Sequence, residues 1–109
     1  MTVKYIDMQK FSLTPYGRYP KDGTDNGETF RKQFLEPAFR DPEIDKVIVN
    51  LDSVQDGYEY GSSFLEESFG GLVRSSGIPA EVVFRKLEIK TIFIDYIQEI
   101  NEYIKRAAA

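Results

Sequence analysis

The sequence predicts an α/β fold, with a small mixed sheet of about four strands and about three helices. An apolar run at residues 47–51 is bounded by polar and turn-forming residues, which is typical of a buried strand. A turn-rich segment follows, and a helical pattern then opens at Ser62 and Ser63. Strand, loop and helix in this order place the loop at the carboxyl edge of a sheet, where open α/β sheets usually carry their functional sites.

The amino-terminal part predicts a strand, a long loop and a helix. Residues 3–11 alternate imperfectly, with Tyr5 on one face and Ile6 on the other. Residues 14–27 are dense in Pro, Gly, Asp and Asn and predict a loop longer than the usual range. The helix is expected from about Gly27 to Phe39, with Pro37 ending or kinking it within a turn. Its apolar side chains recur at helical spacing and are Phe30, Phe34, Leu35 and Ala38.

The second helix is predicted from about Ser63 to Arg74 or Ser76. Ser63 with Glu66 fits a capping box. The pair Gly70-Gly71 inside it costs about 1 kcal/mol per glycine relative to alanine. Two interpretations stay open for this pair: close packing against the sheet, or a bare helix surface where a partner approaches. The apolar stripe consists of Phe64, Leu65, Phe69, Leu72 and Val73.

The carboxyl-terminal part predicts one more strand and a last helix. Residues 80–86 are expected to form one helical turn or two. Residues 87–93 alternate apolar and polar side chains and predict a strand. The last helix, at about 94–106, has its apolar side chains at Ile94, Ile97, Ile100 and Ile104. We interpret residues 1–106 as a single domain and residues 107–109 as a cloning remnant.

The composition excludes several classes of chemistry. The 109 residues contain no cysteine and no histidine, which excludes disulfides, thiolate or imidazole metal ligands and a Ser-His-Asp triad. A net charge of −4 argues against a nucleic-acid partner. No apolar run is long enough to span a bilayer, and no signal peptide opens the chain. We therefore predict a cytoplasmic protein that is not an enzyme, with no cofactor, metal or membrane partner; the oligomeric state stays open.

Several short motifs follow one another in a characteristic order. The strand at residues 47–51 precedes a turn at residues 60–65 and the glycines at 70–71. Upstream stand Gly17-Arg18, Asp22-Gly23, Gly27-Glu28, Phe30-Arg31 and Leu35-Glu36-Pro37. In this order and spacing the chain resembles the STAS-like domain family, whose function is unknown and which is related to the anti-sigma factor antagonists. The resemblance covers residues 3–73 well and the remainder by pattern.

The resemblance implies a regulatory protein-interaction domain that docks on a histidine-kinase-like ATPase or an anti-sigma factor. It places Ser62 at the position of the phosphorylated serine of the antagonists, with Ser63 beside it. The sequence departs from their motif, because Gly61 replaces an acidic residue and Phe64 replaces a glycine. Glu66 and its neighbour Glu67 would repel a phosphate. In the alternative interpretation, Ser63 is only an N-cap and Ser62 a loop residue.

The loop before the second helix is the expected partner-binding face. It is acidic and aromatic, as interaction surfaces often are. In the alternative interpretation, a tyrosine of this loop folds back over the sheet edge. The predicted partner-binding residues are Asp56, Gly57, Tyr58, Glu59, Tyr60, Gly61, Phe64 and Glu67.

A competing hypothesis is a domain that senses a small anionic ligand or a nucleotide. Arg18, Lys21 and the helix start at Gly27 could hold an anion, although a solvated turn cluster explains them better. The carboxylates could also cluster at the end of the central strand, which would permit acid–base chemistry, but no nucleophile with a base is visible. These carboxylates are Asp52, Asp56, Glu66 and Glu67.

Overall fold

The computed structural model describes residues 2–109, which contain one three-stranded sheet. Its strands are β1 (Val3–Asp7), β2 (Lys46–Asn50) and β3 (Leu87–Lys90). β2 lies in the middle and pairs in parallel with both neighbours. Helical segments connect the strands, as parallel pairing requires. All three carboxyl ends therefore point to the same edge of the sheet.

The predicted mixed sheet of four strands is wrong for residues 2–109, because the sheet has three strands and all are parallel. Both outer strands are also shorter than predicted. After β1 the chain turns into a short 3-10 helix, η1 (Met8–Lys10), and the N–H of Gln9 donates to Ser53 Oγ. After β3 the N–H of Ile92 donates to the carboxylate of Asp52, which bends the chain out of the sheet.

Residues 2–109 contain four helical segments, one more than the three predicted. Two of them contain a central π turn, in which a backbone N–H bonds five residues back instead of four. The first joins α1 (Gly27–Phe30), η3 (Arg31–Leu35) and α2 (Glu36–Arg40); the second joins α3 (Ser62–Leu65), η4 (Glu66–Gly70) and α4 (Gly71–Arg74). The others are α5 (Ala80–Lys86), within the stretch where one or two turns were expected, and α6 (Ile94–Ala108). A short 3-10 turn, η2 (Pro20–Asp22), interrupts the predicted long loop.

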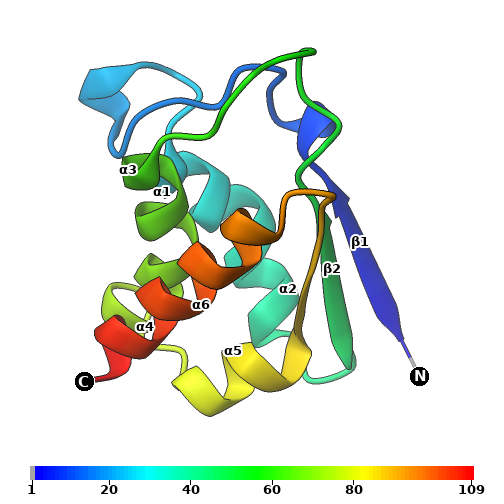
Figure 1. The fold of residues 1–109 in the computed structure, drawn as a ribbon. Coiled ribbons are helices and arrows are strands. Elements are labelled where there is room, and N and C mark those ends of the chain that lie inside the picture. Colours follow the sequence, from blue (N-terminus) through cyan, green and yellow to red (C-terminus); the bar gives the residue numbers. More distant parts are fainter. Residues whose placement is uncertain (1) are drawn as a thin grey trace.

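The helices pack on one face of the sheet, and the core lies between them (Figure 1). The inward strand residues Ile6, Val47 and Val49 are buried, whereas Tyr5 on the outer face is 71% exposed. Parallel sheets are usually covered on both faces, so the bare outer face is unusual. Most predicted stripe residues are buried, including Phe30, Phe64, Phe69, Ile100 and Ile104. No helix in residues 2–109 is long and apolar enough to cross a membrane.

The glycine pair inside the second helix serves helix packing. A Cβ on Gly70 would lie 3.3 Å from the carbonyl oxygen of Tyr103 in α6. A Cβ on Gly71 would lie 2.4 Å from Nη1 of Arg31. Both glycines are buried, so the interpretation as a bare docking surface is wrong. The close packing is against α6 and Arg31 rather than against the sheet.

Candidate functional site

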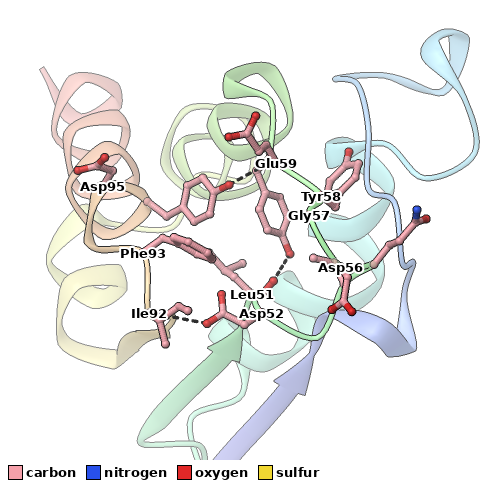
Figure 2. Close-up of a pocket in the computed structure, with 13 residues that line it drawn as sticks. Leu51, Asp52, Asp56, Gly57, Tyr58, Glu59, Ile92, Phe93 and Asp95 are labelled. Carbon is pink, nitrogen blue, oxygen red and sulfur yellow. Dashed lines mark hydrogen bonds between the residues drawn. The ribbon is translucent and has the colours of Figure 1, made fainter.

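A cleft of about 510 Å³ opens at the carboxyl edge of the sheet. Its walls come from the loop after β2 and from the turn between β3 and α6, which bring residues 51–60 beside residues 92–96 (Figure 2). Thirteen residues line it. This volume falls in the range typical of small-molecule and cofactor sites. The cleft is therefore the first candidate for a binding site.

One buried and two half-buried tyrosines build the inner wall of the cleft. The hydroxyl of Tyr60 donates to the carbonyl oxygen of Leu51 at 2.6 Å, and the N–H of Tyr60 donates to the hydroxyl of Tyr96 at 3.1 Å. Burial raises the pKa of Tyr60, so its hydroxyl remains a proton donor. The hydroxyl of Tyr58 donates to the carbonyl oxygen of Pro15. Tyr60 thus folds back over the sheet edge, as one interpretation proposed, and Tyr58 is half-buried.

Four carboxylates surround this aromatic wall (Figure 2). Asp52 follows β2 and is held by Thr91 Oγ1 at 2.7 Å and by the N–H of Ile92 at 2.8 Å. The other three side chains are exposed, and their carboxylates bond to no group among residues 2–109. They are Asp56, Glu59 and Asp95. The lining contains no lysine or arginine, so the cleft is negatively charged.

An apolar ridge borders the cleft where β3 passes into α6. Its residues are Ile92, Phe93 and Ile94, which are 83%, 53% and 65% exposed. The sequence prediction placed Phe93 on a strand, which is wrong because the chain leaves the sheet after Lys90. The helix α6 begins at Ile94, as predicted, but this first residue of its apolar side is exposed. The signal that could have revealed the ridge is its three consecutive apolar residues, which break the strand alternation.

Charged side chains on the two π turns form a buried network. Nη1 of Arg31 donates to Oε2 of Glu67 at 2.5 Å and to the carbonyl oxygen of Glu67 at 2.8 Å. Arg18 from the long loop and Arg74 from α4 each bond to Glu67 Oε1 at 3.1 Å, and both also bond to Glu66. Arg31 and Glu67 are almost completely buried. Burial opposes ionisation of Glu67, but hydrogen bonds from Arg31, Arg74 and Arg18 outweigh it and lower its pKa.

The sequence prediction missed Arg31 and Arg74, and it assigned Glu67 to partner contact. Glu67 is 1% exposed and Phe64 is 0% exposed, so neither side chain is available to a partner. Arg31 lies at helical spacing between Gly27 and Leu35, on the apolar side of its helix. A charged residue on an apolar stripe was the signal that could have found it.

The start of the first long helix offers no free N–H group to an anion. The N–H of Gly27 donates to the carbonyl oxygen of Gly17, and that of Glu28 donates to the carbonyl oxygen of Arg18. The N–H of Thr29 donates to the side chain of the N-cap, Asn26. The Arg18 guanidinium is engaged with the two glutamates, which leaves only the exposed Lys21 of the expected anion site.

The second long helix begins one residue earlier than predicted. Its N-cap is Gly61, and the capping box of Ser63 with Glu66 does not form because Glu66 bonds to Arg18 and Arg74 instead. Ser62 and Ser63 are both exposed in the first turn. No side chain caps this start, so N–H groups of the first turn stay available.

The four carboxylates expected to cluster fall into two separate groups. Asp52 and Asp56 line the cleft, whereas Glu66 and Glu67 belong to the arginine network. Within residues 2–109 no group of three acidic side chains is arranged to hold a metal ion.

A family model described as "STAS-like domain of unknown function (DUF4325)" matches residues 26–92, from the N-cap of the first long helix to the ridge. The match begins later than the resemblance in the sequence and extends further, because it includes α5 and β3. Searches of curated proteins and of solved structures found no match. The family match covers more than half of the chain and confirms the predicted relationship. The chain therefore belongs to the STAS-like domains of unknown function.

Proposed function

We propose that this protein is a regulatory docking domain, which binds a protein partner at the carboxyl edge of its sheet. The docking face comprises the cleft, the ridge Ile92–Ile94 and the first turn of the helix at Ser62. The resemblance to the anti-sigma factor antagonists supports a histidine-kinase-like ATPase or an anti-sigma factor as the class of partner. The domain would act as a competitor: while it is bound, the partner could not bind its other target protein.

The exposed ridge is the observation that carries this proposal. Three consecutive large apolar side chains in water, directly beside a cleft, are unusual on a small domain and mark interaction sites. Burial of apolar surface contributes roughly 25 cal/mol per Å² in a complex. The aromatic wall behind the ridge adds the residue types that anchor interfaces.

Ser62 is the proposed control point of docking. It is exposed two residues beyond Tyr60 of the cleft wall, at a helix start whose first turn has available N–H groups. The repulsion expected from Glu66 and Glu67 is reduced, because three arginines bond to these two carboxylates. A phosphate at Ser62 would place about two negative charges beside the docking face and would change partner affinity.

A pull-down from the source cell, read by mass spectrometry, tests the docking function. Wild type should recover a specific partner, and the double variant Ile92→Ser/Phe93→Ser should lose it. Tyr5→Ser is the matched control, because it removes an equally exposed apolar side chain from the opposite, outer face of the sheet. If no specific partner is recovered, or if the ridge variant retains it, docking at this face is refuted.

The control point is tested by measuring the affinity of the recovered partner for Ser62→Asp, with Ser62→Asn as the neutral control of the same shape. A loss of partner affinity of about tenfold or more in Ser62→Asp but not in Ser62→Asn, equivalent to about 1.4 kcal/mol, would support a phosphorylation switch. Equal affinities of Ser62→Asp and Ser62→Asn for the partner would indicate that docking is controlled by the concentration of the partner.

In the competing hypothesis, the domain senses a small anion or a nucleotide. The helix start at Ser62 still has N–H groups available to such a ligand, whereas the start at Gly27 has none. Thermal shift with ATP, GTP and inorganic phosphate separates it from docking. A ligand present at 100 times its dissociation constant stabilises a domain by roughly 2.7 kcal/mol. A domain of about this size should then melt roughly 10 °C higher. No shift with any of the three would leave docking as the remaining function.

A further inference from the structure

The cleft combines an apolar interior with a negative rim, and this combination selects its occupant. Of its thirteen lining residues, four carry carboxylates and none carries a positive charge. Asp52 is occupied by bonds to Thr91 and Ile92, but three carboxylates remain without a partner among residues 2–109. They stand on two segments, Asp56 and Glu59 on one and Asp95 on the other, and Figure 2 shows their carboxylates at the outer margin of the cleft, pointing away from its aromatic interior.

An anionic group entering this cleft would be repelled, and a neutral one would leave the rim carboxylates partly desolvated without compensation. A cation of the arginine or lysine type avoids both costs. Its charged end pairs with carboxylates, and its methylene stem or guanidinium plane lies on aromatic rings. Tyr60, Tyr96 and Phe93 supply these rings, with centroids 5.3 Å apart for the first pair and 5.7 Å apart for the second.

The ridge adds a second requirement. Ile92 and Phe93 line the cleft and are largely exposed, so a bound segment must also offer apolar side chains next to its cation. A lone small cation would pair with the rim carboxylates but would leave the apolar side chains of the ridge in water.

We propose that the cleft receives a short basic and apolar segment of the partner protein, with an arginine or lysine side chain at its negatively charged rim and neighbouring apolar side chains on the ridge. This inference rests on the proposed docking function and specifies the chemistry of the partner. The overall charge of −4 would also steer a basic segment toward the domain.

Selection of random linear peptides displayed on phage, with the immobilised wild-type domain as bait, tests the proposal. The selected peptides should be enriched in arginine or lysine beside leucine, isoleucine or aromatic residues. Recovery of acidic or uncharged peptides, or of none, would overturn it.

The best selected peptide is then labelled, and its binding is measured by fluorescence anisotropy. Replacing its cation by citrulline or glutamine should weaken binding about tenfold or more. The triple variant Asp56→Asn/Glu59→Gln/Asp95→Asn should weaken it similarly and reduce its salt dependence. Glu43→Gln is the matched control, since this exposed glutamate precedes β2 at the opposite, amino edge of the sheet and should leave binding unchanged.

Two outcomes overturn the proposal at this stage. One is equal binding of the peptide by the triple variant and by wild type. The other is binding of arginine amide alone as tightly as the peptide, which would indicate a small organic cation as the occupant. The failure of the docking function is distinguishable from both. A cellular partner that the triple variant still captures refutes the basic segment and leaves docking intact, whereas a partner retained by Ile92→Ser/Phe93→Ser refutes docking at this face.

Discussion

Glu67 shows at the scale of one residue how a charge is kept inside a small domain. Its carboxylate accepts from Arg18, Arg31 and Arg74, and it is 1% exposed. A buried ion pair gains little over an apolar pair of the same volume, but removing one partner leaves the other charge buried and uncompensated. The network therefore fixes the relative position of the long loop and two helices more than it adds net stability.

Glu67→Ala should lower the free energy of unfolding by about 3–5 kcal/mol, because it leaves Arg31 buried without its carboxylate. The double variant Arg31→Met/Glu67→Leu should lose less than Glu67→Ala does, since no unpaired charge remains. Urea denaturation measures both. The control Glu102→Ala breaks the exposed pair with Arg106 and should cost less than about 0.5 kcal/mol. A double variant that loses as much stability as Glu67→Ala, or more, would contradict this account.

Stability should fall in acid through the same residue. The pKa of Glu67 in the folded protein is lowered from its ordinary value of 4.5, so the unfolded chain takes up this proton first as the pH falls. The contribution of Glu67 is complete above pH 4.5 and is lost as the pH drops through its folded pKa. Urea unfolding from neutral to acid pH measures the decline, which should be smaller in Glu67→Gln. An NMR titration of the Glu67 carboxyl carbon that gave a midpoint above 4.5 would contradict it.

At the scale of elements, the two long helices contact each other where both are widened by π turns. The N–H of Glu36 bonds to the carbonyl oxygen of Arg31, and that of Gly71 bonds to the carbonyl oxygen of Glu66, each five residues back. The π turns contain Arg31 and Glu67, so the buried pair lies at the helix crossing. The helices also approach closely just before the π turns, because a Cβ on Gly27 in α1 would lie 2.8 Å from the carbonyl oxygen of Phe64 in α3.

Gly27→Ala should destabilise the domain by about 1–3 kcal/mol, although alanine is the better helix former, because the added methyl group would clash with backbone at the crossing. Thermal or urea denaturation measures this loss. Gly61→Ser is the contrasting variant at the start of the other helix. Nothing lies within 4 Å of its Cβ position, and serine is a good N-cap, so stability should change by only a few tenths of a kcal/mol. A neutral or stabilising Gly27→Ala would refute the close approach.

At the scale of the whole molecule, the parallel sheet divides the chain into a rigid part, the sheet itself, and connections that can open locally. β2 is hydrogen-bonded on both sides and its Val47 and Val49 are fully buried. The cleft and the ridge stand at the carboxyl edge, on connections that lie outside the sheet and are mostly exposed. Binding surfaces drawn from such connections are expected to open locally while the sheet stays closed.

Hydrogen exchange should therefore be slowest at the amides of β2, which are expected to exchange only when the whole domain unfolds. Amides of residues 53–59 and 92–94 should exchange faster, through local opening. Native-state exchange read by NMR across a urea series measures both. Equal protection of the cleft loop and of β2 would contradict this division, and would indicate a rigid docking face.

The sequence by itself determined the class of the fold and the location of the candidate site at the end of the central strand. Alternation and helical spacing record which side chains face the core, so Val47, Val49, Phe30 and Ile100 were predicted correctly from local pattern. Composition likewise excluded disulfide and imidazole chemistry. Only the tertiary structure decided the number of strands, the pairing of Arg31 with Glu67 across 36 residues, and the joining of residues 51–60 with 92–96 into one cleft. These contacts depend on how distant segments cross, which no local period encodes, and for that reason Glu67 was taken for a partner contact and Ile92 and Phe93 for the end of a strand.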